Sequence, residues 1–399
     1  MNLDILKFLG SGAKMMAMLP FNLLSGKADD NYPVRNVESW DEEREDILER
    51  ANWLCEQVIK EPKQLIADAP SMIGEEYQGE WAIYSCSMLA HALANIAVIY
   101  PDSAEKCPEL IGKLVEIVNT PEMRKYDTMQ WHEDAMQSLD GLKSHMTYLS
   151  ILAWIITNYK LAGGDGRYDA LLHRLCETLN RRMLESKYDM NLLSFPGKPI
   201  WLPDMLVTLV ALRNYGRLFD SRYEGTVEKW LHNAKTKWIH KGTGLLAGQL
   251  PGQSRRVKSM VMRGSHTALI CSYLTLVDEA FAREQYEKMK RVFVHETTLL
   301  GCKVKGIKEY LRKLPNFSMK AGDAGLIIKG ISAGGTAFAY GAPTFFGDWE
   351  FRNQLLRTAE IASGTVKEKG KRHYRMAEMF LVGEATVLAM RTNVKRFVL

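Results

Sequence analysis

The feature that most constrains the fold of this chain is an alternation of two kinds of helical segment. One kind has apolar residues every three to four positions and charges elsewhere, which is the pattern of a helix on a protein surface. The other kind is apolar nearly all round, which requires burial on every side. The amphipathic segments are residues 41–60, 104–118, 167–185, 222–238, 282–296 and 348–363, and the apolar segments are residues 81–99, 143–161, 202–215, 264–277, 322–339 and 374–390.

The apolar segments begin about 50 to 60 residues apart, six times over. A repeat of this length, built from one outer and one inner helix that cannot bury its face alone, is typical of a stacked array. Six such units are expected to close, so the sequence predicts an all-α fold, an (α/α)6 barrel or toroid of six outer–inner helix pairs. An open HEAT or TPR array is the alternative, but those repeats are shorter. Strand patterns are confined to residues 299–304 and 325–331.

The connections between units are short turns, such as Gly163 to Gly166 and Pro251-Gly252, and none resembles a linker. We therefore expect one barrel domain over residues 36–399, preceded by an N-terminal arm over residues 1–35. The arm is apolar enough to dock on its own domain or on a neighbouring subunit of a homo-oligomer. A helix lying on a membrane surface is the alternative for the arm.

Composition excludes several classes of function. The 399 residues carry 52 basic and 47 acidic side chains, far from the concentrated positive face that nucleic-acid binding requires, so no nucleic-acid partner is expected. The six cysteines are scattered without the spacing of a zinc site, and we expect reduced thiols and no metal. No apolar run reaches the length of a transmembrane span, which favours a cytoplasmic protein.

Motifs for common cofactors are also missing. The sequence has no GxGxxG, GxxxxGK[ST] or HExxH pattern and no acid-rich diphosphate-binding motif, so we expect no cofactor. The basic runs 255–258 and 367–375 are interpreted as solvated loops, with a carboxylate or phosphate on the substrate as the functional alternative.

Polar residues gather just before, or in the first turn of, the apolar segments. In a ring these positions converge on one mouth, where a binding site is expected. His145, His266 and His373 stand at corresponding places in the second, fourth and sixth units, so we expect them to face one cavity. Glu80 and Asp204 occupy similar places. A histidine on an apolar helix is more often a core residue and an acid at a helix start more often a cap, but together they could transfer a proton.

The same mouth is rich in large apolar rings. A cavity that combines such rings with a few acids and histidines fits a hydrophobic small molecule, whereas a sugar would require more amide and charged groups. The aromatic candidates for substrate binding are Tyr77, Trp81, Trp131, Phe195, Trp201 and Tyr340.

Several stretches also resemble a known family in their order and spacing. They are Tyr84-Ser85, Lys143-Ser144-His145-Met146-Thr147-Tyr148-Leu149, Leu250-Pro251-Gly252-Gln253-Ser254 and His266-Thr267-Ala268, and they are similar to the linalool dehydratase/isomerase family. The resemblance implies an (α/α)6 barrel and a cofactor-free enzyme acting on a lipophilic, terpenoid-like or polyketide-like molecule.

The resemblance also implies roles for single residues. His145 matches the family histidine near the substrate alcohol, Asp68 is the nearest candidate for its N-terminal catalytic aspartate, and Gln249 stands where the family has a tyrosine near the substrate. The paired family cysteines fall at Ser194 and Pro203, so the thiol chemistry of the family cannot be carried over.

We therefore predict a cofactor-independent acid/base lyase, isomerase or cyclase in which His145 and an acid, Asp204 or Glu80, relay a proton, with His266 and Tyr77 as secondary candidates. The alternative is a carbohydrate epimerase, glycosidase or lyase of the same barrel shape. An epimerase would use two histidines, His145 with His266 or His373, and a glycosidase or lyase would use a carboxylate pair or a Tyr/His pair. A third hypothesis is a noncatalytic helical scaffold in which the histidines are core residues.

Overall fold

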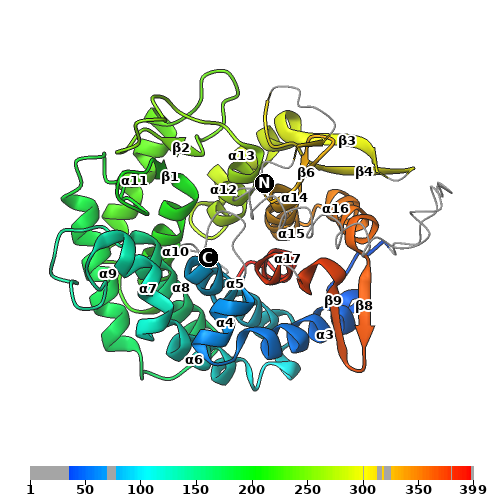
Figure 1. Ribbon diagram of the computed structural model, residues 1–399, viewed down its shortest axis with the longest axis horizontal. Coiled ribbons are helices and arrows are strands. Elements are labelled where there is room, and N and C mark those ends of the chain that lie inside the picture. The colour runs from blue at the N-terminus through cyan, green and yellow to red at the C-terminus, as the bar shows by residue number, and fades with distance from the viewer. Residues whose placement is uncertain are drawn as a thin grey trace, which may run out of the picture.

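Six inner helices form a closed ring in the computed structural model, which describes residues 36–69, 78–299, 301–311, 317–318, 325–378 and 380–396. Each inner helix packs against the next, and the last packs against the first. Figure 1 shows them around the centre of the molecule. They are α5 (Gln78–Ile99), α8 (Met146–Leu161), α10 (Leu202–Leu218), α12 (Gly264–Leu274), α14 (Ala333–Phe338) and α17 (Leu381–Arg391).

An outer helix precedes or follows each inner one along the chain, toward the edge of the ring (Figure 1). The predicted (α/α)6 barrel is therefore confirmed. The outer helices are α3 (Trp40–Val58), α6 (Cys107–Val118), α9 (Asp169–Leu184), α11 (Glu224–Lys237), α13 (Glu279–Phe293) and α16 (Trp349–Ser363). Short additional elements are α4 (Pro62–Asp68), η2 (Pro101–Ser103), α7 (Pro121–Trp131) and α15 (Gly341–Phe346). The predicted arm, residues 1–35, lies outside the described residues.

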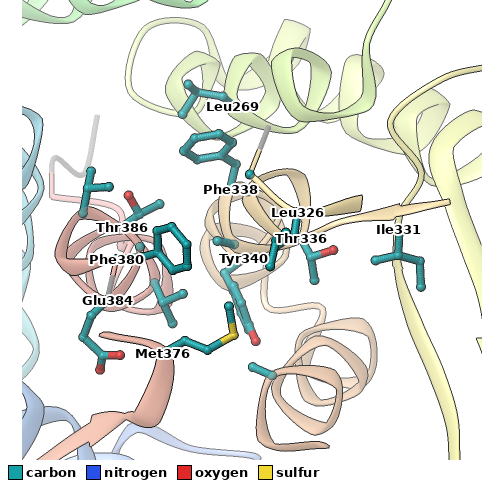
Figure 2. Close-up of a pocket in the computed structure, with 18 of the residues that line it drawn as sticks. Leu269, Leu326, Ile331, Thr336, Phe338, Tyr340, Met376, Phe380, Glu384 and Thr386 are labelled. Carbon is teal, nitrogen blue, oxygen red and sulfur yellow. The ribbon is translucent and has the colours of Figure 1, made fainter. Parts of the chain in front are cut away.

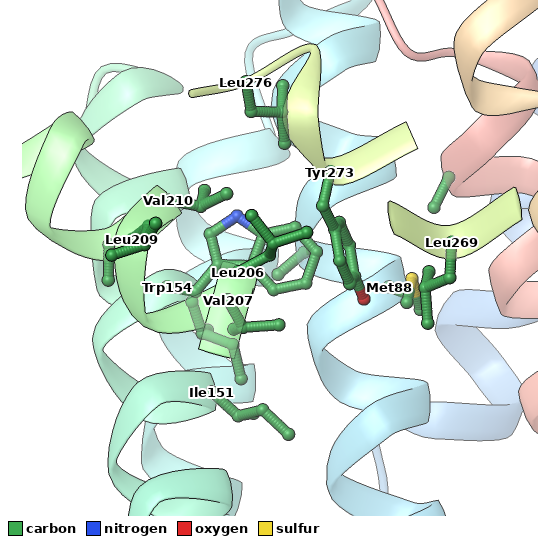
Figure 3. Packing of buried hydrophobic residues seen from close by; sticks show 14 of the residues in the cluster. Met88, Ile151, Trp154, Leu206, Val207, Leu209, Val210, Leu269, Tyr273 and Leu276 are labelled. Atoms are coloured by element: carbon green, nitrogen blue, oxygen red, sulfur yellow. The ribbon is translucent and has the colours of Figure 1, made fainter. Parts of the chain in front are cut away.

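Large apolar side chains from the inner helices fill part of the centre of the ring, as Figure 3 shows. Trp154 of α8 meets Tyr273 of α12 edge-on, with ring centroids 5.6 Å apart, and Met88 of α5 packs into the same cluster. Among the described residues, α5 alone is long and apolar enough to cross a membrane, but 78% of its most apolar window is buried inside the ring. That burial is what an inner helix of a barrel requires.

Buried ion pairs connect the first outer helix to the last unit. Glu43 of α3 accepts hydrogen bonds from Arg391 of α17, at 2.7 Å, and from Arg352 of α16. Arg50 of α3 donates to Glu384 of α17 at 2.7 Å. All five side chains are almost fully buried. Charge pairing across the seam, in addition to apolar packing, thus closes the ring.

The fifth unit departs from the predicted repeat. The prediction of an inner helix over residues 322–339 is wrong for the residues before Ala333. There β6 (Ile327–Ile328) and β7 (Ile331–Ser332) form a hairpin that precedes the short helix α14. The turn residues Lys329 and Gly330 have φ values of 48° and 87°, which a helix cannot contain. The strand patterns noted near residues 299–304 and 325–331 are confirmed, the first by the hairpin of β3 (Val294–Leu299) and β4 (Cys302–Ile307). A two-residue strand β5 (Phe317–Ser318) pairs with β6.

The sixth unit is also entered by a hairpin. The inner helix predicted over residues 374–390 begins only at Leu381, after β8 (Thr365–Glu368), β9 (Lys371–Tyr374) and the 3-10 turn η3 (Arg375–Glu378). The interpretation of residues 367–375 as a solvated loop is wrong, since Arg372 on β9 forms ion pairs with Glu45 and Glu49 of α3.

A last two-stranded pair joins β1 (Ile200–Trp201) to β2 (Gln249–Leu250).

Candidate active site

A cavity of about 640 Å³ lies among the N-terminal parts of α5, α10, α12 and α17. This volume is within the range of about 300–1,000 Å³ typical of small-molecule sites. Most of its wall is hydrophobic or aromatic, with a few charged or amide groups. The predicted site residues that line it are Glu80, Trp81, Phe195, Trp201, Asp204, Gln249, His266 and Tyr340.

Asp204 lies in the first turn of α10, directly after Pro203, and two hydroxyl groups orient its carboxylate. Tyr84 of α5 donates to Oδ1 at 3.0 Å and Ser194 donates to Oδ2 at 2.5 Å. Burial raises the pKa of Tyr84 well above its usual value, and the negative charges of Asp204 and Glu80 raise it further. Tyr84 therefore stays protonated as a donor and helps to fix the carboxylate against the cavity.

His266 is the third residue of α12, and a buried carboxylate anchors the start of that helix. Glu309 accepts hydrogen bonds from Arg263 Nε at 2.5 Å and from Ser265 Oγ at 2.9 Å. A carboxylate is favourable at a helix N-terminus, where backbone N–H groups lack helical partners. The anchored first turn places His266 in the cavity wall, with 6% of its surface exposed.

Gly248 couples the positions of the two candidate proton-transfer groups. Its carbonyl accepts a hydrogen bond from the N–H of Leu202, where α10 begins, and a Cβ at this residue would lie 2.7 Å from the Cβ and Nδ1 of His266. Only glycine permits so close an approach without a shift of the imidazole. The turn before β2 therefore holds Asp204 and His266 at one cavity.

The aromatic part of the wall retains unused hydrogen-bond donors. The Nε1 of Trp81 and the hydroxyls of Tyr340 and Tyr374 are buried and have no protein hydrogen-bond partner. Phe195 and Trp201 meet edge-on nearby, with ring centroids 6.4 Å apart. A ligand with oxygen atoms could accept hydrogen bonds from these donors, while the rings exclude water.

The prediction that His145 and Trp131 face the cavity is wrong, since neither residue lines it. His145 precedes α8 with a left-handed φ of 44°, and its fully buried ring contacts Trp131 and Asp127 of α7. The distance from Nδ1 to Asp127 Oδ2 is 2.5 Å, and that from Nε2 to Glu133 Oε1 is 3.1 Å. Burial raises the pKa of Asp127, although the hydrogen bond with His145 opposes the shift. These contacts hold His145 between α8 and α7.

His373 and Asp68 also lie away from the cavity wall, contrary to prediction. His373 is on β9, stacked on Trp53 of α3 with ring centroids 4.3 Å apart, because β9 packs against that outer helix. Asp68 ends α4 on the surface, where Lys60 donates to it at 2.9 Å. Although partial burial opposes the shift, that hydrogen bond contributes to a pKa of Asp68 below its usual range. Tyr77 lies outside the described residues.

Three residues of the site were not predicted from the sequence: Tyr84, Ser194 as an Asp204 partner, and Glu384. Tyr84 follows Glu80 by one helical turn, so i, i+4 spacing could have placed both on the same face. Glu384 is a buried acid on an apolar helix, a feature that usually signals a partner, here Arg50. Within the described residues, no group of three His, Cys, Asp or Glu side chains is placed to hold a metal ion.

Comparisons with known proteins give no family assignment. No protein-family profile and no curated protein matches the sequence. Among solved structures, a family 105 glycoside hydrolase from C. acetobutylicum ATCC 824 is similar with a TM-score of 0.49 and 11% identity, over 77% of this chain and 92% of that one. A family 76 glycoside hydrolase from a bovine Bacteroides thetaiotaomicron strain gives a TM-score of 0.39 and 10% identity, over 76% of this chain and 68% of that one. Likenesses this weak carry no information about activity.

Proposed function

We propose that this protein is a cofactor-independent enzyme of the lyase, isomerase or cyclase type that moves a proton on a lipophilic small molecule. The observation that carries the proposal is the placement of Asp204 and His266 in the wall of one largely apolar cavity. A carboxylate and an imidazole are the two side chains most often used as general acids and bases. Surrounding aromatic rings would limit the access of water to reactive intermediates.

The proposed chemistry follows from the contacts of each group. Asp204, fixed by the hydroxyls of Tyr84 and Ser194, would exchange a proton with a hydroxyl, alkene or enol of the substrate. His266, held close to Gly248, would exchange the second proton. Trp81 and neighbouring rings can stabilise a positive charge that develops on carbon, because the faces of aromatic rings are electron-rich.

The resemblance to the linalool dehydratase/isomerase family supports the same location. Pro203, at the position of one family cysteine, and Gln249, at the position of a family tyrosine, line the cavity. Ser194, at the position of the other cysteine, donates to Asp204. His145, which the resemblance placed near the substrate, is packed behind α8 instead, so the proposal assigns no proton transfer to it.

One observation favours a second candidate. Glu80 and Asp204 both line the cavity, and a pair of carboxylates is the usual apparatus of glycoside hydrolysis. The scarcity of amide and charged groups on the rest of the wall favours a lipophilic substrate over a sugar.

Substrate screening with matched variants tests the proposal. We would incubate the protein with terpenoid alcohols and, separately, with neutral oligosaccharides, and identify products by mass spectrometry. Conversion of an alcohol should fall about 100-fold to 10,000-fold in Asp204→Asn and in His266→Ala, while ligand affinity changes little. Asp140→Asn is the control, because that side chain is 95% exposed on the surface.

Each other outcome contradicts the proposal. Hydrolysis of the oligosaccharides, lost in Asp204→Asn, would establish the glycosidase alternative. Binding of lipophilic ligands without turnover of any would indicate a binding protein. Equal turnover by Asp204→Asn and Asp140→Asn would remove Asp204 from the chemistry.

A further inference from the structure

The cavity extends from the centre of the ring into the fifth and sixth units. Its other wall is made by β3, β4, β7, α14, α16, η3 and α17, and we call this part the side branch. In Figure 2, Phe338 and Tyr340 lie between Phe380 on the left and Ile331 on the right. The side branch exists because α14 has only 6 residues, whereas the inner helix α5 has 22. The departure from the repeat therefore creates space that a longer inner helix would fill.

Small side chains keep the side branch open on the side of the outer helix. Ala359 and Ala362 of α16 line it, as does Gly383 of α17. Other parts of helix α16 pack against α15, β4 and β9. A buried space lined by alanine and glycine is costly for an empty protein, since each missing contact forfeits dispersion energy, and a bound hydrocarbon would restore those contacts.

Hydrogen bonds within the protein already satisfy several polar groups of the side branch. The hydroxyl of Thr336 donates to Ser332 O at 2.7 Å, and that of Thr358 donates to Lys305 O at 2.6 Å. The carboxylate of Glu384 is paired with Arg50. Tyr340 and Tyr374 retain hydroxyls without a protein partner. The remaining wall is mainly apolar, with Leu299, Val304, Ile328, Met376, Phe380 and Val382 among its residues.

The central part of the cavity has the opposite character. Glu80, Lys198, Asp204, Gln249 and His266 all line it there, on or next to the segments that enter α5, α10 and α12. Most of the charged groups thus lie at the central end and most of the apolar groups in the side branch, where Lys329 also lines the wall and donates to Thr298 O.

We propose that the substrate is an elongated amphipathic molecule, a long hydrocarbon chain with a hydroxylated end. The hydroxylated end lies between Asp204 and His266, and the chain runs past Phe338 into the side branch. This inference rests on the proposed function for its reacting end. The side branch then selects substrates by the length of the chain, because each methylene group that it buries adds favourable transfer free energy.

Binding of straight-chain primary alcohols, from hexanol to dodecanol, tests the inference by titration calorimetry. Affinity should rise about fourfold for each methylene group that enters the side branch. In Ala362→Phe the added ring occupies the side branch, so dodecanol should bind at least tenfold more weakly and hexanol should bind as before. Glu350→Phe is the control, since it adds the same ring to an exposed position of α16.

Three results would overturn the inference: no alcohol binds, affinity does not depend on chain length, or Ala362→Phe weakens hexanol and dodecanol equally. If Ala362→Phe does not fold, as judged by circular dichroism, Ala359→Leu provides the same test with a smaller side chain. Asp204→Asn separates this inference from the proposed function. It should abolish turnover and leave the chain-length dependence intact. Turnover without chain-length dependence would refute the side branch alone, and chain-length dependence without turnover would refute the enzyme alone.

Discussion

Replacing Glu43 by Gln should open the seam at which the barrel closes. The carboxylate of Glu43 is 3% exposed and accepts hydrogen bonds from Arg391 and Arg352, both buried. Burial alone would raise the pKa of Glu43, but the charges of these two arginines hold that pKa below its usual range. Removing the charge leaves two buried guanidinium groups with one acid, Asp46, which pairs with Arg391 at 2.7 Å.

The expected loss can be estimated from this geometry. Removing one partner of a buried ion pair costs about 3–5 kcal/mol, and we expect about 3 kcal/mol because Asp46 and the amide oxygen of Gln compensate in part. An unfolding entropy of about 2.1 cal/mol/K per residue, over the roughly 360 residues 36–396, gives about 0.76 kcal/mol/K. The melting temperature should therefore fall by about 4 °C.

Differential scanning calorimetry of matched variants provides the assay. Glu45→Gln removes a carboxylate from the same helix, but its ion pair with Arg372 is on the surface, with Glu45 75% exposed. Exposed pairs contribute at most about 1 kcal/mol, so Glu45→Gln should lower the melting temperature by about 1 °C or less. Equal shifts in the two variants would refute the argument that buried charge pairing closes the ring.

Three further predictions follow from contacts described above. Folding lowers the pKa of Glu43, so the Glu43 carboxylate stabilises the protein above the unfolded pKa of about 4.3, and this stabilisation is lost as the pH falls. The urea concentration at the unfolding midpoint should therefore decrease below about pH 4.3. This decrease should be smaller in Glu43→Gln. Gly248→Ala should displace His266 and lower turnover at least tenfold, whereas Gly225→Ala, which meets no atom within 4 Å, should leave the kinetics unchanged. His145→Ala should lower stability by about 1–3 kcal/mol, because the buried carboxyl group of Asp127 loses its hydrogen-bond partner, and leave alcohol affinity unchanged; a tenfold loss of affinity in calorimetry would instead put His145 in the site.

The sequence predicted the ring because burial on every side leaves a strong pattern. Helices such as α5 and α8 have almost no exposed face, and their observed bounds lie within a few residues of those expected. The pattern is weaker where the repeat is interrupted. In the fifth unit, Lys329-Gly330 forms a turn between two strands, and the alternating apolar residues of a short hairpin also fit a buried helix.

The site was predicted in part, for a similar reason. Asp204 and His266 follow from the rule that residues at the starts of inner helices share one mouth, and Gln249 follows from the family resemblance. His145 is also at the start of an inner helix, but its side chain does not face the cavity. Its left-handed backbone conformation and its contact with Asp127 direct the ring toward α7. Neither a φ value nor the position of α7 is encoded in the helical period, so spacing alone could not distinguish His145 from His266.

A crystal structure with dodecanol bound would show whether this cavity holds a lipophilic alcohol with its hydroxyl at Asp204 and His266. The alcohol oxygen should lie within about 3 Å of Asp204 or His266, and the chain should continue past Phe338 into the side branch. An alcohol bound elsewhere, or a hydroxyl directed away from both residues, would contradict the assignment of this cavity as an acid/base site for a lipophilic substrate.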